Sequence, residues 1–224
     1  LDMVDLQHRL LVDGLGVNHA RLVMGTSMGG MQTWLWGEQH PEFMDALMPL
    51  ASVPGQISGR NRVWRRLIID AIRNDPTWIG GEYKTQPNSL RTVEQMIWLV
   101  GGNPVKKWQA APTLADADRV MEQALAASMR NADVNDILYQ YEASRDYDPA
   151  PGLEKIVAPL LAVNTADDLV NPPDIPVLEK EITRVKRGKA VVIPESEKTN
   201  GHGTHTLAAV WMDYLKQLLK DSEK

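Results

Sequence analysis

The sequence of 224 residues is 43% hydrophobic and 24% charged, a composition typical of a folded protein with one sizeable core. Its formal net charge of −5 lacks the basic excess that phosphate backbones require, and no apolar run approaches the roughly 20 residues that span a bilayer, so neither nucleic acid nor a membrane is an expected partner. There are no cysteines, which excludes disulfides, thiolate metal sites and a cysteine nucleophile and fits a cytoplasmic location.

The first quarter of the chain predicts a helix, a strand, a helix and a strand in that order. Apolar residues at helical spacing indicate the opening helix; they are Met3, Leu6, Leu10, Leu11 and Leu15. Residues 20–24 form a short apolar run typical of a buried strand, and a glycine-rich turn at 25–30 separates it from a helical pattern over 31–40. Residues 46–51 predict a second strand, weakened by Pro49 because proline cannot donate to a strand ladder.

Residues 54–149 have a different character, because strand patterns disappear and helical patterns dominate. The expected helices lie at 63–73, 89–100, 114–129 and 134–145. A segment of roughly 95 residues is too long to be a simple connection between neighbouring elements. We therefore expect an all-helical insertion at 54–149, set between two parts of one core, residues 1–53 and 150–224.

Strand patterns return after the insertion. We expect, in order, a strand at 159–164, a helix at 177–184, a strand at 190–193, a polar loop at 194–203 and a closing helix at 206–219. Strands that alternate with helices form a parallel sheet with helices on both faces. The predicted fold class is therefore α/β, interrupted by the helical insertion.

A nucleophile pattern occupies the glycine-rich turn. Gly25-Thr26-Ser27-Met28-Gly29 matches G-x-S-x-G, in which a sharp turn between a strand and a helix lifts the serine hydroxyl above the sheet edge. An ordinary glycine-rich turn would give the same letters, but the predicted strand before it and helix after it supply the context that the chemistry needs. We expect Ser27 to be the nucleophile, the flanking glycines to avoid collisions, and the backbone N–H of Met28 to stabilise an oxyanion.

A serine nucleophile needs a base, and the base needs an acid that orients it. In this arrangement the acid and then the histidine follow the serine along the chain, which leaves His202 and His205 as candidate bases. His202 is favoured because glycines flank it in the polar loop before the last helix. Asp167 and Asp168 both follow the strand expected at 159–164, and both qualify as the acid, the other then capping the turn. The remaining histidines are expected to be structural; they are His8, His19 and His40.

Other uses of these residues are disfavoured. His202 and His205 could serve as metal ligands, but no third histidine and no acidic cluster accompanies them in the sequence. The glycine spacing and the missing lysine exclude a phosphate-binding P-loop. We therefore expect no metal and no bound cofactor.

Several segments resemble the homoserine O-acetyltransferase group of α/β-hydrolase enzymes, and the likeness covers nearly the whole chain. The segments are Asp2-Met3-Val4, Leu10-Leu11, Leu15-Gly16-Val17, Gly25-Thr26-Ser27-Met28-Gly29-Gly30-Met31-Gln32, Asp75-Pro76-Thr77-Trp78-Ile79-Gly80-Gly81-Glu82-Tyr83, Asp168-Leu169-Val170-Asn171-Pro172-Pro173 and Gly201-His202. The stretch at 75–83 is long and quite specific. The similarity of the acid loop favours Asp168 over Asp167.

The resemblance implies an α/β-hydrolase fold and a ping-pong acyl-transfer mechanism with a small-molecule ester or other acyl donor. Ser27 would take the acyl group, His202 would shuttle the proton, and Asp168 would hold the tautomer of His202. The helical insertion would form a lid over the site, and in the family it often forms a homodimer interface. About four strands precede the nucleophile strand in this fold, and one of them leads into the loop with the second oxyanion N–H, so we expect an N-terminal segment outside this chain to complete the sheet.

Three departures from the family bear on the acyl acceptor. Thr26 stands where acetyltransferases usually have glycine, Gly203 stands where they usually have aspartate, and residues 131–133 read Asn-Ala-Asp where Arg-Phe-Asp helps to hold homoserine. Without that arginine an amino-acid carboxylate loses a bidentate partner, unless Arg60, Arg62, Arg65 or Arg66 replaces it. We therefore expect hydrolysis of small or medium carboxylic esters through an acyl-Ser27 intermediate. The alternatives are transfer of acetyl from acetyl-CoA, as co-substrate, to homoserine or a similar alcohol, and a non-catalytic binding protein on the same fold.

Overall fold

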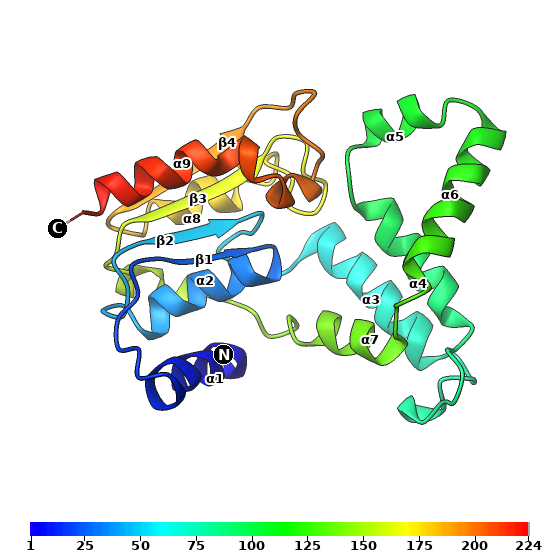
Figure 1. Ribbon diagram of the computed structural model, residues 1–224, viewed down its shortest axis with the longest axis horizontal. Coiled ribbons are helices and arrows are strands. Elements are labelled where there is room, and N and C mark those ends of the chain that lie inside the picture. The colour runs from blue at the N-terminus through cyan, green and yellow to red at the C-terminus, as the bar shows by residue number, and fades with distance from the viewer. Residues whose placement is uncertain (224) are drawn as a thin grey trace. The chain divides into compact units, whose positions relative to one another are not determined.

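The computed structural model describes residues 1–223, and they contain a four-stranded parallel sheet (Figure 1). The strands lie side by side in chain order: β1 (Val23–Thr26), β2 (Leu47–Leu50), β3 (Leu160–Thr165) and β4 (Gly188–Ile193). The register pairs Gly25 with Pro49 and Val163 with Val191. The strand expected at 20–24 therefore begins later and runs up to the nucleophile turn, and the carboxyl ends of all four strands share one edge of the sheet.

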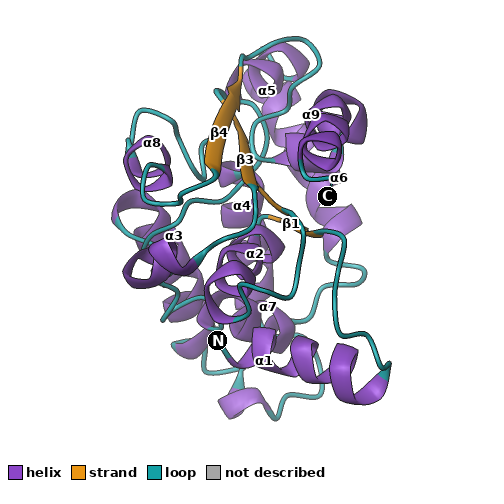
Figure 2. Cartoon of the chain, turned by 90° about the vertical axis from the view of Figure 1, so that its left-hand side faces the viewer, coloured by secondary structure: helices purple, strands orange, loops and turns teal. Residues whose placement is uncertain are grey.

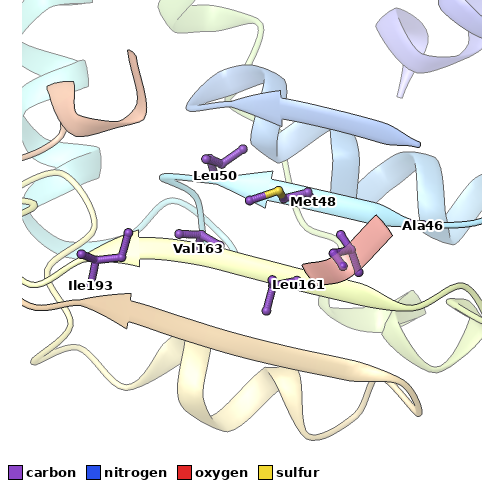
Figure 3. Packing of buried hydrophobic residues seen from close by; sticks show 7 residues of the cluster. Ala46, Met48, Leu50, Leu161, Val163 and Ile193 are labelled. Carbon is purple, nitrogen blue, oxygen red and sulfur yellow. The ribbon is translucent and has the colours of Figure 1, made fainter. Parts of the chain in front are cut away.

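Helices cover both faces of this sheet. On one face α2 (Met28–Gln39) packs against β1 and β2, and α8 (Val177–Ile182) contacts β4. The other face is covered by α9 (Ala208–Asp221), and Figure 2 shows α8 and α9 on opposite sides of β3 and β4. Alternate strand side chains form one apolar cluster with α9 (Figure 3); its buried members are Ala46, Met48, Leu50, Leu161, Val163, Ile193 and Leu218. The two central strands, β2 and β3, are buried along their whole length, which explains why apolar residues dominate both of their faces.

The opening helix α1 (Asp2–Arg9) continues as a short π-helix at Leu10–Gly14. The apolar residues at helical spacing predicted this helix, but they do not form its buried face. Leu6 and Leu10 are 63% and 60% exposed. Val4 is fully buried instead, Gln7 accepts a hydrogen bond from the Trp36 indole N–H of α2, and the His8 ring stacks on His40, which directly follows α2. The helix is thus held mainly by specific polar and aromatic contacts rather than by its leucines.

The chain divides into two compact units, one formed by Leu1–Gln56 with the residues from Tyr147 onward, and one formed by Ile57–Asp146. The second unit contains five α-helices within its described residues: α3 (Gly59–Arg73), α4 (Ser89–Val100), α5 (Pro104–Ala110), α6 (Leu114–Ser128) and α7 (Val134–Glu142). Short 3₁₀ segments lie at Ile79–Gly81, Ala150–Lys155 and Gly203–Thr206. Among residues 1–223 no helix combines the length and the apolar character needed to cross a membrane.

The specific stretch at 75–83 ties the helical unit together. Asp75 accepts hydrogen bonds from the Thr77 side chain and from the N–H of Ser89, the first residue of α4. The bond from Thr77 is the main reason that the pKa of Asp75 is lowered to about 2. The Tyr83 hydroxyl donates to Asp133 over 2.8 Å, and Asp133 caps the start of α7. This stretch therefore fixes the arrangement of α4 and α7 within their unit.

The outer side of β1 is one edge of the sheet. In residues 1–223 its only strand partner is β2, and Met24 in its middle is 37% exposed. An unpaired strand edge readily accepts a further strand. That an N-terminal segment pairs with this edge stays a prediction.

Candidate active site

Ser27 occupies the tight turn between β1 and α2. Its backbone has φ +52° and ψ −113°, a conformation that a serine rarely adopts and that costs about 1–3 kcal/mol. The N–H of Ser27 donates to the carbonyl of Leu50 in the neighbouring strand over 2.9 Å, which holds the strained turn against the sheet. A Cβ on Gly25 would lie 2.2 Å from the carbonyl oxygen of Gly29, whereas a Cβ on Gly29 would meet nothing within 4 Å. The expectation that both glycines avoid collisions is right for Gly25 and wrong for Gly29.

The structure brings Ser27, His202 and Asp168 together in one hydrogen-bonded chain. The Nε2 of His202 lies 2.8 Å from the Oγ of Ser27, and its Nδ1 lies 2.9 Å from the Oδ2 of Asp168. An ionised carboxylate only accepts, so Nδ1 carries the proton and Nε2 is left to accept from the serine hydroxyl. The Asp168 side chain is 1% exposed and that of His202 is 16% exposed. Ser27, Asp168 and His202 therefore have the order and contacts of nucleophile, acid and base.

Asp168 is held in place by its own loop. Its Oδ1 accepts from the backbone N–H groups of Val170 and Asn171 at 2.7 and 3.1 Å. The Asn171 side chain donates to the carbonyl of Ala51, which follows β2 with a φ of +50°. The sequence analysis assigned no role to Asn171. An aspartate whose side chain accepts from the backbone N–H groups two and three residues later forms an Asx turn, and this spacing was the available signal. One oxygen of the carboxylate thus accepts from the turn, and the other lies 2.9 Å from His202 and also accepts from the Asn171 side chain over 3.4 Å.

The two residues that competed for these roles lie close by but make different contacts. The His205 ring lies edge-on to His202, with 5.2 Å between ring centroids, and the backbone carbonyl of His205 accepts from the Trp211 indole N–H. Burial, followed by the nearby His202, lowers the pKa of His205. Asp167 accepts from the backbone N–H of Gly201 over 2.7 Å, whereas Asp168 accepts from the His202 ring.

The oxyanion donor expected at Met28 lies at the first position of α2. The N–H groups in the first turn of a helix lack partners within the helix and lie at the positive end of its dipole. The N–H of Met28 is such a group, one residue beyond the Ser27 hydroxyl. This position suits it to a negative oxygen that develops next to Ser27.

The remaining histidines lie outside this cluster. His8 and His40 stack face to face at 3.8 Å, and His19 pairs with Asp45 over 3.1 Å. Burial is the main cause of the lowered pKa of His40. Within the described residues, no three side chains of His, Asp or Glu gather as metal ligands.

No protein-family model matches the chain. The homoserine O-acetyltransferase of Trichormus variabilis is 32% identical over 195 residues, which covers 77% of this chain and 52% of that protein. The solved structure of homoserine O-acetyltransferase from Bacillus anthracis has a TM-score of 0.86 at 20% identity and covers 97% of this chain and 64% of its own. The structure of esterase E22 has a TM-score of 0.83 at 21% identity, with 97% and 66% covered. The chain spans about half the length of the curated relatives that it matches first.

Proposed function

Because the chain belongs to the homoserine O-acetyltransferase-like group of the α/β-hydrolase fold, we propose that it carries the catalytic residues of a serine acyl-transfer enzyme that hydrolyses small or medium carboxylic esters. The observation that supports this most directly is the hydrogen-bonded chain from Ser27 through His202 to Asp168. Both links have the length of good hydrogen bonds, and a neutral imidazole in this tautomer is ready to take the serine proton.

Acylation begins when the Ser27 oxygen attacks the ester carbonyl carbon and His202 takes the hydroxyl proton at Nε2. The carbonyl oxygen becomes an oxyanion, which the N–H of Met28 stabilises. Asp168 stabilises the imidazolium that His202 has become, without taking its proton. When the tetrahedral intermediate collapses, the bond to the leaving alkoxide breaks and His202 returns the proton to it, so that an alcohol leaves and Ser27 stays acylated.

Deacylation repeats these steps with water as the nucleophile. His202 takes a proton from water, whose oxygen attacks the acyl carbon, and then returns that proton to the Ser27 oxygen as the acid product forms. His202 and Asp168 serve both acylation and deacylation, because the end of each half-reaction restores the neutral His202 tautomer that Asp168 holds. No bound metal or cofactor is needed in this proposal.

Water is proposed as the acceptor because of residues 131–133. In this chain Asp133 lies at the start of α7, where it accepts from the N–H groups of Asn135 and Asp136. It also accepts from Tyr83 and Gln86. The segment therefore acts as a helix cap and carries no cation that could pair with an amino-acid carboxylate.

Acetyl transfer to homoserine is the second candidate, and Arg65 is the observation that favours it. The partners of its guanidinium in the described helical unit are neutral: it donates to Asn61 and Ser144 and lies over the rings of Trp64 and Tyr141. Burial lowers the pKa of Arg65. By contrast, Arg66 is paired with Asp70 over 2.7 Å. A half-buried guanidinium with neutral partners is suited to an anionic group such as a carboxylate.

Turnover assays on one preparation test the proposal. We expect hydrolysis of p-nitrophenyl acetate to exceed acetyl-CoA-dependent acetylation of L-homoserine, and we expect Ser27→Ala to lower turnover by about 10⁴–10⁶-fold. Saturable acetylation of homoserine that outpaces hydrolysis and weakens in Arg65→Met would favour the transferase. A protein that neither turns over substrate nor reacts at Ser27 with a fluorophosphonate probe would be a binding protein on this fold.

A further inference from the structure

We propose that Asp167 is a positioning residue, which holds the backbone of the histidine loop so that His202 meets both Ser27 and Asp168. The inference rests on the proposed function, because it assigns Asp167 a part in the same site. The two adjacent acids then have different roles: Asp168 orients the imidazole ring of His202, and Asp167 fixes the backbone that precedes His202.

The peptide that precedes His202 is held by two side chains from the end of β3. The N–H of Gly201 donates to the Oδ2 of Asp167 over 2.7 Å, and the Oγ1 of Thr165 donates to the carbonyl of Gly201 over 3.3 Å. Asp167 and Thr165 are 8% and 7% exposed, so water competes little for these bonds. Both polar groups of Gly201 are thus fixed to the strand that also leads into Asp168.

The conformation of Gly201 shows why the loop needs this support. Gly201 has a φ of +54°, in the left-handed region, and His202 follows it directly. Glycine adopts this conformation readily but also many others, so the loop gains no rigidity from Gly201 itself. The hydrogen bond that Gly201 donates to the buried Asp167 side chain selects one of these conformations. The position of the His202 ring depends on this conformation of Gly201.

The consequence for catalysis is geometric. The His202 ring must keep its Nε2 within hydrogen-bond distance of Ser27 while its Nδ1 stays bonded to Asp168. A displacement of about 1 Å can lower the rate about 10²-fold even when every catalytic side chain is present. Asp167 acts through the backbone that carries His202. Its removal should therefore lower kcat and leave KM nearly unchanged.

The experiment compares Asp167→Ala with Asp167→Asn, whose amide oxygen can still accept from Gly201, and with Asp174→Ala, an exposed acid in the same loop. The first readout is the far-downfield NMR resonance of the Nδ1 proton shared with Asp168, which needs no turnover. We expect it to be lost or broadened in Asp167→Ala and kept in the other two variants. The second readout is ester turnover, with kcat lowered about 10–100-fold in Asp167→Ala, KM changed less than about threefold, and kcat largely rescued in Asp167→Asn.

If Asp167→Ala does not fold, Thr165→Val tests the other anchor with the same two readouts and should weaken both in the same direction. A resonance and a kcat that survive Asp167→Ala would overturn the proposal, and so would equal losses in Asp167→Ala and Asp167→Asn. A wild-type protein that turns over no ester but loses the resonance in Asp167→Ala would refute the proposed function while supporting this role of Asp167.

Discussion

The two glycines of the nucleophile turn should respond in opposite ways to the same substitution. The G-x-S-x-G pattern treats Gly25 and Gly29 alike, but a Cβ on Gly25 would lie 2.2 Å from the carbonyl oxygen and 2.3 Å from the carbonyl carbon of Gly29. Both atoms belong to the backbone and cannot rotate away. Reaching ordinary contact at about 3.5 Å requires the end of β1 and the start of α2 to separate by roughly 1 Å.

That separation sets the expected magnitudes for Gly25→Ala. Overpacking of this kind lowers the free energy of unfolding by about 1–3 kcal/mol. In a protein of this size each kcal/mol shifts Tm by about 2–4 °C, so we expect Tm to fall by about 2–12 °C. A shift of roughly 1 Å at Ser27 should slow its reaction about 10²-fold. Gly29→Ala meets open space in the first turn of α2 and should be neutral or stabilising by up to about 1 kcal/mol, because alanine favours helix over glycine.

Urea unfolding followed by tryptophan fluorescence measures the stability difference, and the rate of labelling by a fluorophosphonate probe measures the reactivity of Ser27. Gly29→Ala is the matched control, since it adds the same methyl group four residues away. The reasoning is refuted if Gly25→Ala is as stable and as reactive as Gly29→Ala. It is also refuted if Gly29→Ala is the more damaging of the two.

Two further predictions concern the histidines. In an ester-hydrolysis assay His202→Ala should lower the rate nearly as much as Ser27→Ala, by about 10⁴–10⁶-fold. His205→Ala should lower the rate only a few-fold. The reverse order would make His205 the base. Burial holds the pKa of His40 in the folded protein below its ordinary value of 6.5, so the unfolded chain binds more protons than the folded one at pH values just below 6.5. The free energy of unfolding should therefore fall as the pH drops below 6.5. Replacing His40 by phenylalanine, which keeps a ring against His8, should flatten the dependence of the urea midpoint on pH, and an unchanged slope would contradict this.

The sequence alone determined the features that depend on near neighbours along the chain. The order of strand, glycine turn and helix around Ser27 predicted the nucleophile turn, and the helical spacing at 89–100 predicted α4 with the bounds that the structure has. The resemblance to homoserine O-acetyltransferases is supported by the relatives and solved structures. One helix was not predicted: no element was expected between 100 and 114, but asparagine before proline caps a helix at Asn103, and α5 begins at Pro104.

The tertiary structure decided what depends on residues far apart in sequence. The buried face of α1 follows from the contacts of Gln7 with Trp36 and of His8 with His40, which the spacing of leucines could not reveal. Asp167 and Asp168 are adjacent and chemically identical, so residue type could not separate them. They differ in what lies opposite each carboxylate, the Gly201 N–H for one and the His202 ring for the other, 34 residues later in the chain. A local pattern fixes the backbone that neighbouring residues can form, but a hydrogen bond between distant residues exists only once the sheet has brought the ends of its strands together.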